Sequence, residues 1–221
     1  KYISQNDILI HLAAFIPSNF NKSLFLDQCF RYNVSSTENL INIAVKKKVS
    51  HFIYYSAGNA YFDNKSAATE KSSLYPTGNA VSYLSSKISA EIILKHICKK
   101  YQIPYTIFRI SSPYGPYNNS FINKIFENFK KNRPITLFQG GLASADFVFV
   151  EDISKLVLKS LDQKVYGTYN VGSGIRTTLL EIANQVLSFY GKNNDLIQIE
   201  TILKSDYIQK FPVLDCTKAI N

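Results

Sequence analysis

Two spacings of hydrophobic residues succeed each other along the first half of the chain. Short apolar runs, rich in β-branched and aromatic residues, predict buried strands within 7–15, 51–57 and 104–110. Longer segments with apolar residues at helical spacing lie between these runs, at 24–48 and 81–101. The order strand, helix, strand, helix, strand predicts an α/β fold with a parallel sheet and crossover helices.

The pattern becomes more mixed after residue 116. The expected elements are a helix at 120–132, a strand at 135–140, a strand running into a helix at 147–161, a strand end with a turn at 169–174, and a helix at 177–191. Thr177 is the expected N-cap of the last helix and Gly191 its C-cap. The segments 58–79 and 111–119 are rich in Asn, Ser, Gly and Pro and are expected to be loops.

This change in pattern predicts two lobes. Residues 1–115 would form a domain built around the parallel sheet, and residues 116–221 a smaller, mixed α/β lobe. The segment 146–161 is expected to return to the first domain. Ligands of parallel α/β sheets bind at the carboxyl ends of the strands, where 11–14, 56–58 and 111–113 fall.

Composition excludes several classes of protein. The chain has 221 residues, 46% of them hydrophobic, yet no run approaches the roughly 20 apolar residues that span a bilayer. The sequence lacks the anatomy of a signal peptide, so no membrane partner is expected. The three cysteines are widely spaced, which predicts reduced thiols in a cytoplasmic protein. The histidines show no metal-ligand spacing, and no metal is expected.

The net charge of +9 raises the question of nucleic-acid binding. The lysines are scattered, and the clusters at 46–48 and 130–131 lie near expected helix ends, where they complement the helix dipole. No basic stripe is evident, so we expect no nucleic-acid partner. An anionic small molecule fits the charge equally well.

Two Tyr-x-x-x-Lys pairs are candidates for proton-transfer chemistry. Asp63 and Asn64 interrupt any helix around Tyr61 and Lys65, so that spacing has no geometric meaning. Tyr83 and Lys87 lie inside an expected helix, where side chains four apart share a face. A nearby ammonium favours phenolate and lowers a tyrosine pKa, which suits proton transfer coupled to hydride transfer. A simple surface pair is the alternative that spacing alone leaves open.

Seven short motifs occur in the order found in the extended short-chain dehydrogenase/reductases. They are D-x-L-I-H-L-A-A (7–14), N-V-x-x-T-x-N-L (33–40), S-A-G-N-A-Y (56–61), Y-x-x-x-K (83–87), R-I-S-S-P-Y-G-P (109–116), D-F-V-F-V-E-D (146–152) and Y-N-V-G-S-G (169–174). The chain thereby resembles the NAD-dependent epimerase/dehydratase family, whose members modify nucleotide sugars. The resemblance implies a Rossmann-like sheet, NAD or NADP as cofactor, and a nucleotide-sugar substrate. It also implies that residues 1–115 are part of a dinucleotide-binding domain and that residues 116–221 mainly bind substrate.

The resemblance also implies roles for individual residues. Tyr83 would be the catalytic acid/base, Lys87 would hold the nicotinamide ribose and lower the Tyr83 pKa, and Ser56 would assist them. The residues implied to contact the cofactor are His11, Ala13, Ala14, Asn33, Tyr55, Ser56, Tyr83, Lys87, Pro113 and Tyr114. Those implied to contact substrate are Ala57, Gly58, Ser112 and Asp146. Family members are typically homodimers that pair through the Tyr-x-x-x-Lys helix, here with Ile88, Ile92 and Cys98.

The chain also departs from the family pattern. The Gly-rich turn that cradles the pyrophosphate is absent and no Met is present, so we expect that the first strands, about sixty residues, are missing. The end, 214–221, is expected to be clipped too. Ala57 stands where a catalytic Ser or Thr is usual, Ser112 where Asn is common, and Ala145 in place of an Arg. These changes keep open the alternative of a weakened or non-enzymatic relative with a binding or regulatory role.

Overall fold

The structure is a computed structural model that describes residues 2–17, 25–62, 66–117, 120–200 and 208–221. Its main sheet has the order β1-β2-β3-β7. The strands are β1 (Ile8–His11), β2 (His51–Ala57), β3 (Tyr105–Ile110) and β7 (Gly167–Val171), and all neighbours pair in parallel. The parallel sheet expected from the hydrophobic pattern is confirmed.

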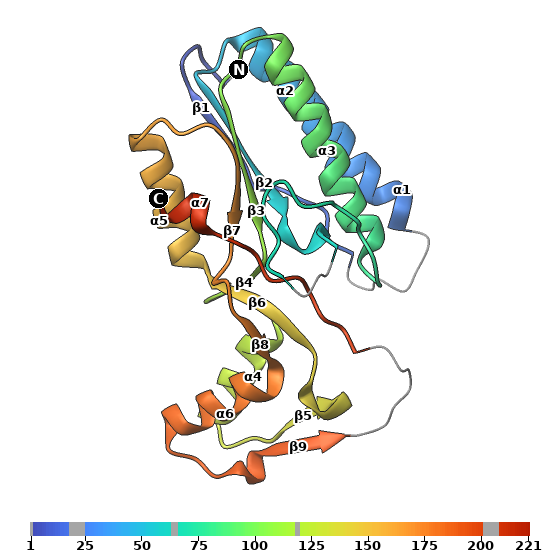
Figure 1. The fold of residues 1–221 in the computed structure, drawn as a ribbon, viewed down its shortest axis with the longest axis vertical. Helices are drawn as coiled ribbons and strands as arrows, with labels where there is room; N and C mark the ends of the chain where they lie inside the picture. Colours follow the sequence, from blue (N-terminus) through green and yellow to red (C-terminus); the bar gives the residue numbers. More distant parts are fainter. Residues whose placement is uncertain (1, 18–24, 63–65, 118–119, 201–207) are drawn as a thin grey trace.

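Helices cover both faces of this sheet (Figure 1). On one face lie α1 (Phe25–Cys29), α2 (Ser36–Lys47) and α3 (Val81–Lys100), and on the other α5 (Val150–Asp162). Strand β2 contributes to both interfaces, because successive side chains of a strand point to opposite faces. Phe52 and Tyr54 belong to the core beneath α2 and α3, whereas Ile53 packs with Ile153 and Val157 of α5.

The expected helix at 24–48 is present in the described residues as one helical run with a wider turn inside it. A π-helical segment, η1 (Phe30–Ser35), joins α1 to α2. Such π-turns are rare and occur frequently at functional sites. Helix α2 ends at Lys48, whose backbone is left-handed with a φ of 52°.

Strand β1 corrects the expectation of a buried strand. Ile8 and Ile10 are 47% and 41% exposed. Among the described strands β1 pairs with β2 alone, so it is an edge of the sheet. The helix on the face of Ile8 and Ile10, α5, packs against β2, β3 and β7 and does not reach them.

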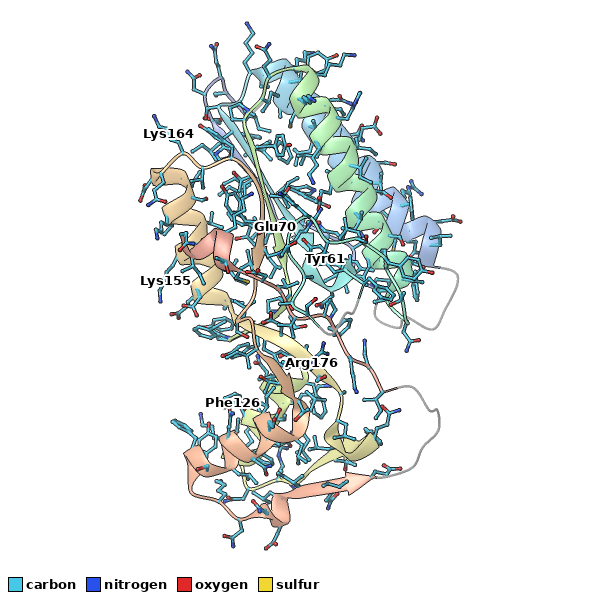
Figure 2. The ribbon with its side chains drawn as sticks, viewed as in Figure 1. Tyr61, Glu70, Phe126, Lys155, Lys164 and Arg176 are labelled. Atoms are coloured by element: carbon cyan, nitrogen blue, oxygen red, sulfur yellow. The ribbon has the colours of Figure 1, made fainter. Side chains whose placement is uncertain are left out.

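The second lobe holds two smaller sheets (Figure 1). One consists of β4 (Ser112–Tyr114), β6 (Ser144–Phe149) and β8 (Arg176–Thr178), and the other of β5 (Ile135–Phe138) and β9 (Ile197–Glu200). Helices α4 (Phe121–Lys130) and α6 (Leu179–Tyr190) enclose its core, which includes Ile125, Phe129 and Leu187. Figure 2 shows Phe126 and Arg176 in this lobe and Tyr61 and Glu70 in the first.

The short elements differ most from the expectations. The segment 111–119, expected to be a loop, contains β4, in which Pro113 is tolerated because β4 is an edge strand of its sheet. The loop 58–79 begins with a 3₁₀ turn, η2 (Gly58–Ala60). Strands β8 and β9 were not expected. Short elements remain at η3 (Gln139–Gly141), η4 (Asn194–Leu196) and α7 (Thr217–Ile220).

The N-cap of α6 is Thr178 and not Thr177. The Thr178 side chain accepts a hydrogen bond from the Glu181 backbone, and Glu181 accepts one from the Thr178 backbone, which makes a capping box. Thr177 instead pairs with Ala145 in the β6–β8 ladder. The predicted C-cap is confirmed, since Gly191 has a φ of 59°.

Candidate active site

Helix α3 carries both members of the candidate pair, because its hydrophobic side buries against β2 and brings one face of its first two turns toward the ends of the strands. Lys87 is 2% exposed and Tyr83 is partly buried. Both side chains line one pocket of about 490 Å³ next to Ala57, the last residue of β2. The pair is therefore not a solvated surface pair.

Lys87 is buried without a carboxylate at its ammonium. Its Nζ lies 4.2 Å from the centre of the Tyr54 ring, and the Tyr54 hydroxyl donates to the Lys87 backbone carbonyl at 3.3 Å. Burial lowers the pKa of Lys87 to about 7, and the charge of Glu91 opposes that shift. The hydrogen bonds and ion pairs among the described residues include none from Nζ, so the cation has donors free for a ligand in the pocket that Lys87 lines.

The Tyr83 pKa is shifted in the direction opposite to the one expected. Burial raises the pKa of Tyr83 to about 12, and the nearby Cys29 thiol adds to the rise. Lys87 does not offset this shift, because its ammonium lies over Tyr54 and its own charged form is penalised by burial. In this structure Tyr83 is a neutral phenol at neutral pH, suited to donate a proton.

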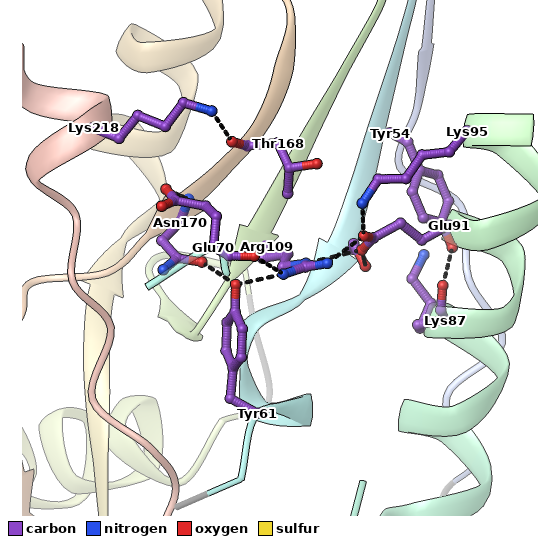
Figure 3. A network of polar contacts seen from close by, with 11 residues as sticks. Tyr54, Tyr61, Glu70, Lys87, Glu91, Lys95, Arg109, Thr168, Asn170 and Lys218 are labelled. Carbon is purple, nitrogen blue, oxygen red and sulfur yellow. Dashed lines mark hydrogen bonds and ion pairs between the residues drawn. The ribbon is translucent and has the colours of Figure 1, made fainter. Parts of the chain in front are cut away.

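Ser56 bonds to a buried ion network, whose members Glu91, Lys95 and Arg109 are shown in Figure 3. Its hydroxyl donates to Glu91 Oε2 at 2.8 Å, and Arg109 binds both Glu91 oxygens at 2.5 and 3.1 Å. Lys95 adds a contact of 2.6 Å. Burial would raise the pKa of Glu91, but the contacts with Arg109 and Lys95 outweigh it and the pKa lies below its ordinary value.

The other Tyr-x-x-x-Lys tyrosine belongs to the same network. The Tyr61 hydroxyl accepts from Arg109 at 2.6 Å and donates to Asn170 at 2.7 Å, and the residue is 2% exposed. Tyr61 is thus a buried bracing residue between β3 and β7, and Lys65 lies outside the described residues.

Asn33 connects the site to the loop after β1. Its carboxamide accepts from the Phe15 backbone N–H at 2.6 Å and donates to the Phe15 carbonyl at 3.0 Å and to Ser86 at 2.9 Å. The π-turn of η1 carries Asn33 to this position, between the loop and α3. Asn33 is 2% exposed and braces the pocket without lining it.

His11 braces the same region from β1. Its Nε2 lies 2.9 Å from the Thr37 hydroxyl, and its ring packs 5.6 Å from that of Tyr54. Burial lowers the pKa of His11 to about 4, and the charge of Lys87 contributes. His11 and the exposed Ala13 do not line the pocket, whereas Ala14 does.

The pocket brings together eight of the predicted site residues. They are Ala14, Tyr55, Ser56, Ala57, Tyr83, Lys87, Ser112 and Pro113. Eleven further lining residues had no predicted contact of their own, although two of them, Leu12 and Ser111, fall in the segments expected at the carboxyl ends of the strands. The eleven are Leu12, Ile16, Asn59, Leu84, Ile110, Ser111, Ser120, Phe121, Ile122, Phe147 and Leu179. The apolar ones come mostly from the second lobe and from α3. The position of Asn59, directly after a parallel strand, is a signal that could have identified it.

Besides His11, Ala13 and Asn33, three more predicted residues do not line this pocket. Gly58 packs against Leu214, and a Cβ on it would lie 2.6 Å from Leu214 Cδ1. Tyr114 lines a second cavity, of about 570 Å³, between α4 and α6. Asp146 is fully buried and accepts hydrogen bonds from the Ser173, Gly174 and Leu214 backbone N–H groups, which gives it a structural role in this structure.

Within the described ranges, no group of three or more His, Cys, Asp or Glu side chains is arranged to hold a metal ion. In the same part of the chain, no helix combines the length and apolarity needed to cross a membrane.

Proteins of known sequence resemble this chain over nearly its whole length. It is 28% identical over 213 residues to the dTDP-D-glucose 4,6-dehydratase of Bos taurus, and 27% to that of Homo sapiens, with 95% of this chain covered in each case. The alignments cover 58% and 59% of those proteins, so the chain spans about three fifths of the curated relatives it matches.

Solved structures share the fold. The dTDP-glucose 4,6-dehydratase of Bacillus anthracis, in complex with NAD, superposes with a TM-score of 0.79 at 24% identity and covers 96% of this chain and 65% of its own. The UDP-glucuronic acid 4-epimerase of Bacillus cereus gives 0.82 at 20% identity, with 98% and 69% covered. The family described as the NAD dependent epimerase/dehydratase family matches residues 1–172. This chain belongs to the NAD-dependent epimerase/dehydratase family.

Proposed function

We propose that the full-length protein is an NAD-dependent nucleotide-sugar epimerase or dehydratase that transiently oxidises its sugar. The observation that carries this proposal is that Tyr83 and Lys87 line one pocket at the carboxyl ends of β2 and β3, in a chain of this family. The names of the relatives support the substrate class, since they are dTDP-glucose dehydratases and a UDP-glucuronic acid epimerase.

The residues present fit the nicotinamide end of a dinucleotide. Lys87 offers an ammonium with unused donors at the edge of the pocket, which suits the hydroxyls of a ribose. Ala14 and Pro113 provide small and apolar surface on either side. When bound, NAD supplies a hydride acceptor for the carbon that carries the reacting hydroxyl. NADP would be accommodated by the same contacts.

Tyr83 would exchange the hydroxyl proton of the sugar. As the hydroxyl is oxidised its proton passes to the phenol oxygen of Tyr83, which must be a phenolate at that moment. Burial opposes the phenolate, so a positive charge close to the phenol is required. Lys87, one helical turn away, would supply it by moving from its place over Tyr54 toward Tyr83 when the ligands bind. The proton returns when the sugar is reduced again.

The first test is Tyr83→Phe in the full-length protein. We expect turnover of UDP- and dTDP-hexoses to fall at least about 100-fold, since general acid–base catalysis contributes that much or more. Tyr101→Phe is the matched control, because Tyr101 lies at the end of the same helix, is 51% exposed and does not line the pocket. Wild-type turnover in Tyr83→Phe would contradict the assignment.

We also propose that the protein is a homodimer in the cytoplasm. The outer side of α3 supports a dimer, because Ile92 is 62% exposed in a stripe with the exposed His96 and Lys99. Ile88 and Cys98, the other residues implied at such an interface, are buried in this chain's own core. Free thiols at all three cysteines support a reducing compartment.

A further inference from the structure

A polar cluster at the carboxyl ends of β2 and β3 faces the same pocket as Tyr83. Its members are Asn59, Ser111 and Ser112. The Asn59 carboxamide donates to the Ser112 hydroxyl at 3.2 Å and accepts from the Ser111 hydroxyl at 3.3 Å. The cluster forms because β2 and β3 are adjacent and in register, with Ala57 opposite Ile110.

The backbone holds Asn59 in a fixed place. It is the middle residue of η2, which begins directly after β2. The preceding Gly58 lies so close to β3 that a Cβ would be 3.0 Å from the Arg109 carbonyl oxygen and 2.6 Å from Leu214 Cδ1. The turn therefore lies tightly against β3, and the Asn59 side chain is held by the two serines that follow that strand.

The cluster keeps hydrogen-bonding capacity for a ligand. A carboxamide has two N–H donors and an oxygen with two lone pairs. Among the described residues, Asn59 uses one donor and one lone pair, and the Ser112 hydroxyl retains its own proton to donate. One N–H and one lone pair of Asn59 are therefore unused in a residue that lines the pocket.

The nearest side chains leave few alternatives for holding a sugar. Ser56 is committed to Glu91, and Ala57 has no polar side-chain atom. The second lobe adds apolar residues such as Phe121, Ile122 and Leu179 to the lining of the same pocket. A mostly apolar pocket with a small set of polar groups suits a hexose, which presents both C–H surfaces and hydroxyls.

We propose that Asn59, braced by Ser111 and Ser112, binds a hydroxyl of the hexose and thereby orients the reacting carbon toward Tyr83. This assignment rests on the proposed function and adds a substrate-binding residue to it. An amide neither gives nor takes a proton at neutral pH, so Asn59 contributes binding and orientation and performs no proton transfer.

The test measures binding in the full-length protein carrying Tyr83→Phe, so that no turnover occurs. Calorimetry compares a UDP-hexose with UDP alone, and dTDP-glucose with dTDP. We expect Asn59→Ala to weaken binding of the nucleotide sugars about tenfold, the loss of one well-placed hydrogen bond, and to leave binding of UDP and dTDP unchanged. Ser112→Ala removes the acceptor that braces Asn59 and also the free donor of the Ser112 hydroxyl, so it should weaken sugar-nucleotide binding in the same direction.

Control measurements distinguish a failure of this inference from a failure of the proposed function. Asn128→Ala is the matched control, because Asn128 is partly exposed on α4, donates to the Lys124 carbonyl and does not line the pocket. Thermal unfolding of each variant shows that it is folded. Two results would overturn this inference and leave the proposed function standing. One is that Asn59→Ala binds nucleotide sugars as tightly as the parent does, and the other is that it binds nucleotide sugars and free nucleotides equally more weakly. A parent protein that binds no nucleotide sugar overturns both.

Discussion

Glu91 is the central residue of the buried ion network in the first lobe. Its carboxylate accepts from Ser56, Arg109 and Lys95, and its side chain is 1% exposed. Arg109 in turn binds the hydroxyl of Tyr61. Removing one member of such a pair leaves a buried charge without its partner, which costs far more than removing both.

We therefore predict a non-additive pair of substitutions. Arg109→Met should lower the free energy of unfolding by about 3–5 kcal/mol, whereas the double variant Glu91→Leu/Arg109→Met should lie within about 2 kcal/mol of wild type. Urea unfolding of the full-length protein measures both. Glu127→Gln is the control, because its pair with Lys131 is exposed and should contribute less than about 1 kcal/mol. A double variant as unstable as Arg109→Met would contradict this prediction.

The residue types alone could not show which side chains take part in this buried ion network. The sequence predicts that Tyr83 and Lys87 share a helical face, because that depends on local spacing. The partner of Ser56 is 35 residues away along the chain, and that of Tyr61 48 residues away. Burial likewise reverses the expected direction of the Tyr83 pKa, which no spacing indicates. Functional roles that depend on tertiary contacts lie beyond the pattern of a single sequence.

At the scale of elements, the length of a helix or strand determines how well its position can be predicted from the sequence. Helix α3 and strands β2 and β3 were predicted to within a residue or two, because each carries several periodic positions. Strands β4 and β8 have three residues each and no period of their own. Their strand conformation comes from pairing with β6, a tertiary interaction.

The two threonines before α6 provide a matched test of element boundaries. Thr178→Ala should lower the free energy of unfolding by about 1 kcal/mol, since it removes the N-cap and half of the capping box with Glu181. Thr177→Ala should cost less, because that residue contributes a ladder position in β8 and no cap. Thermal or urea unfolding of the two variants decides the order. A larger loss for Thr177→Ala would place the helix start one residue earlier.

At the scale of the whole molecule, the pocket depends on both lobes. The main sheet and α3 supply the polar groups, among them Tyr83, Lys87 and Asn59, whereas the second lobe supplies Phe121, Phe147 and Leu179. The change of pattern after residue 116 predicted a second lobe. It could not predict which of its apolar side chains face the pocket, because their order along the chain is unrelated to their place around it.

The proposed dimer gives the last prediction, since an exposed apolar side chain at an interface core tolerates no charge. Ile92→Lys should shift the full-length protein from dimer to monomer in sedimentation velocity, because burying an unpaired ammonium at the interface is costly. Leu158→Lys is the matched control: Leu158 is 63% exposed, almost the same as Ile92 at 62%, but lies on α5 across the sheet. If only the Leu158→Lys variant dissociated, the interface would lie on α5 and not on α3. A monomeric wild type would exclude the dimer.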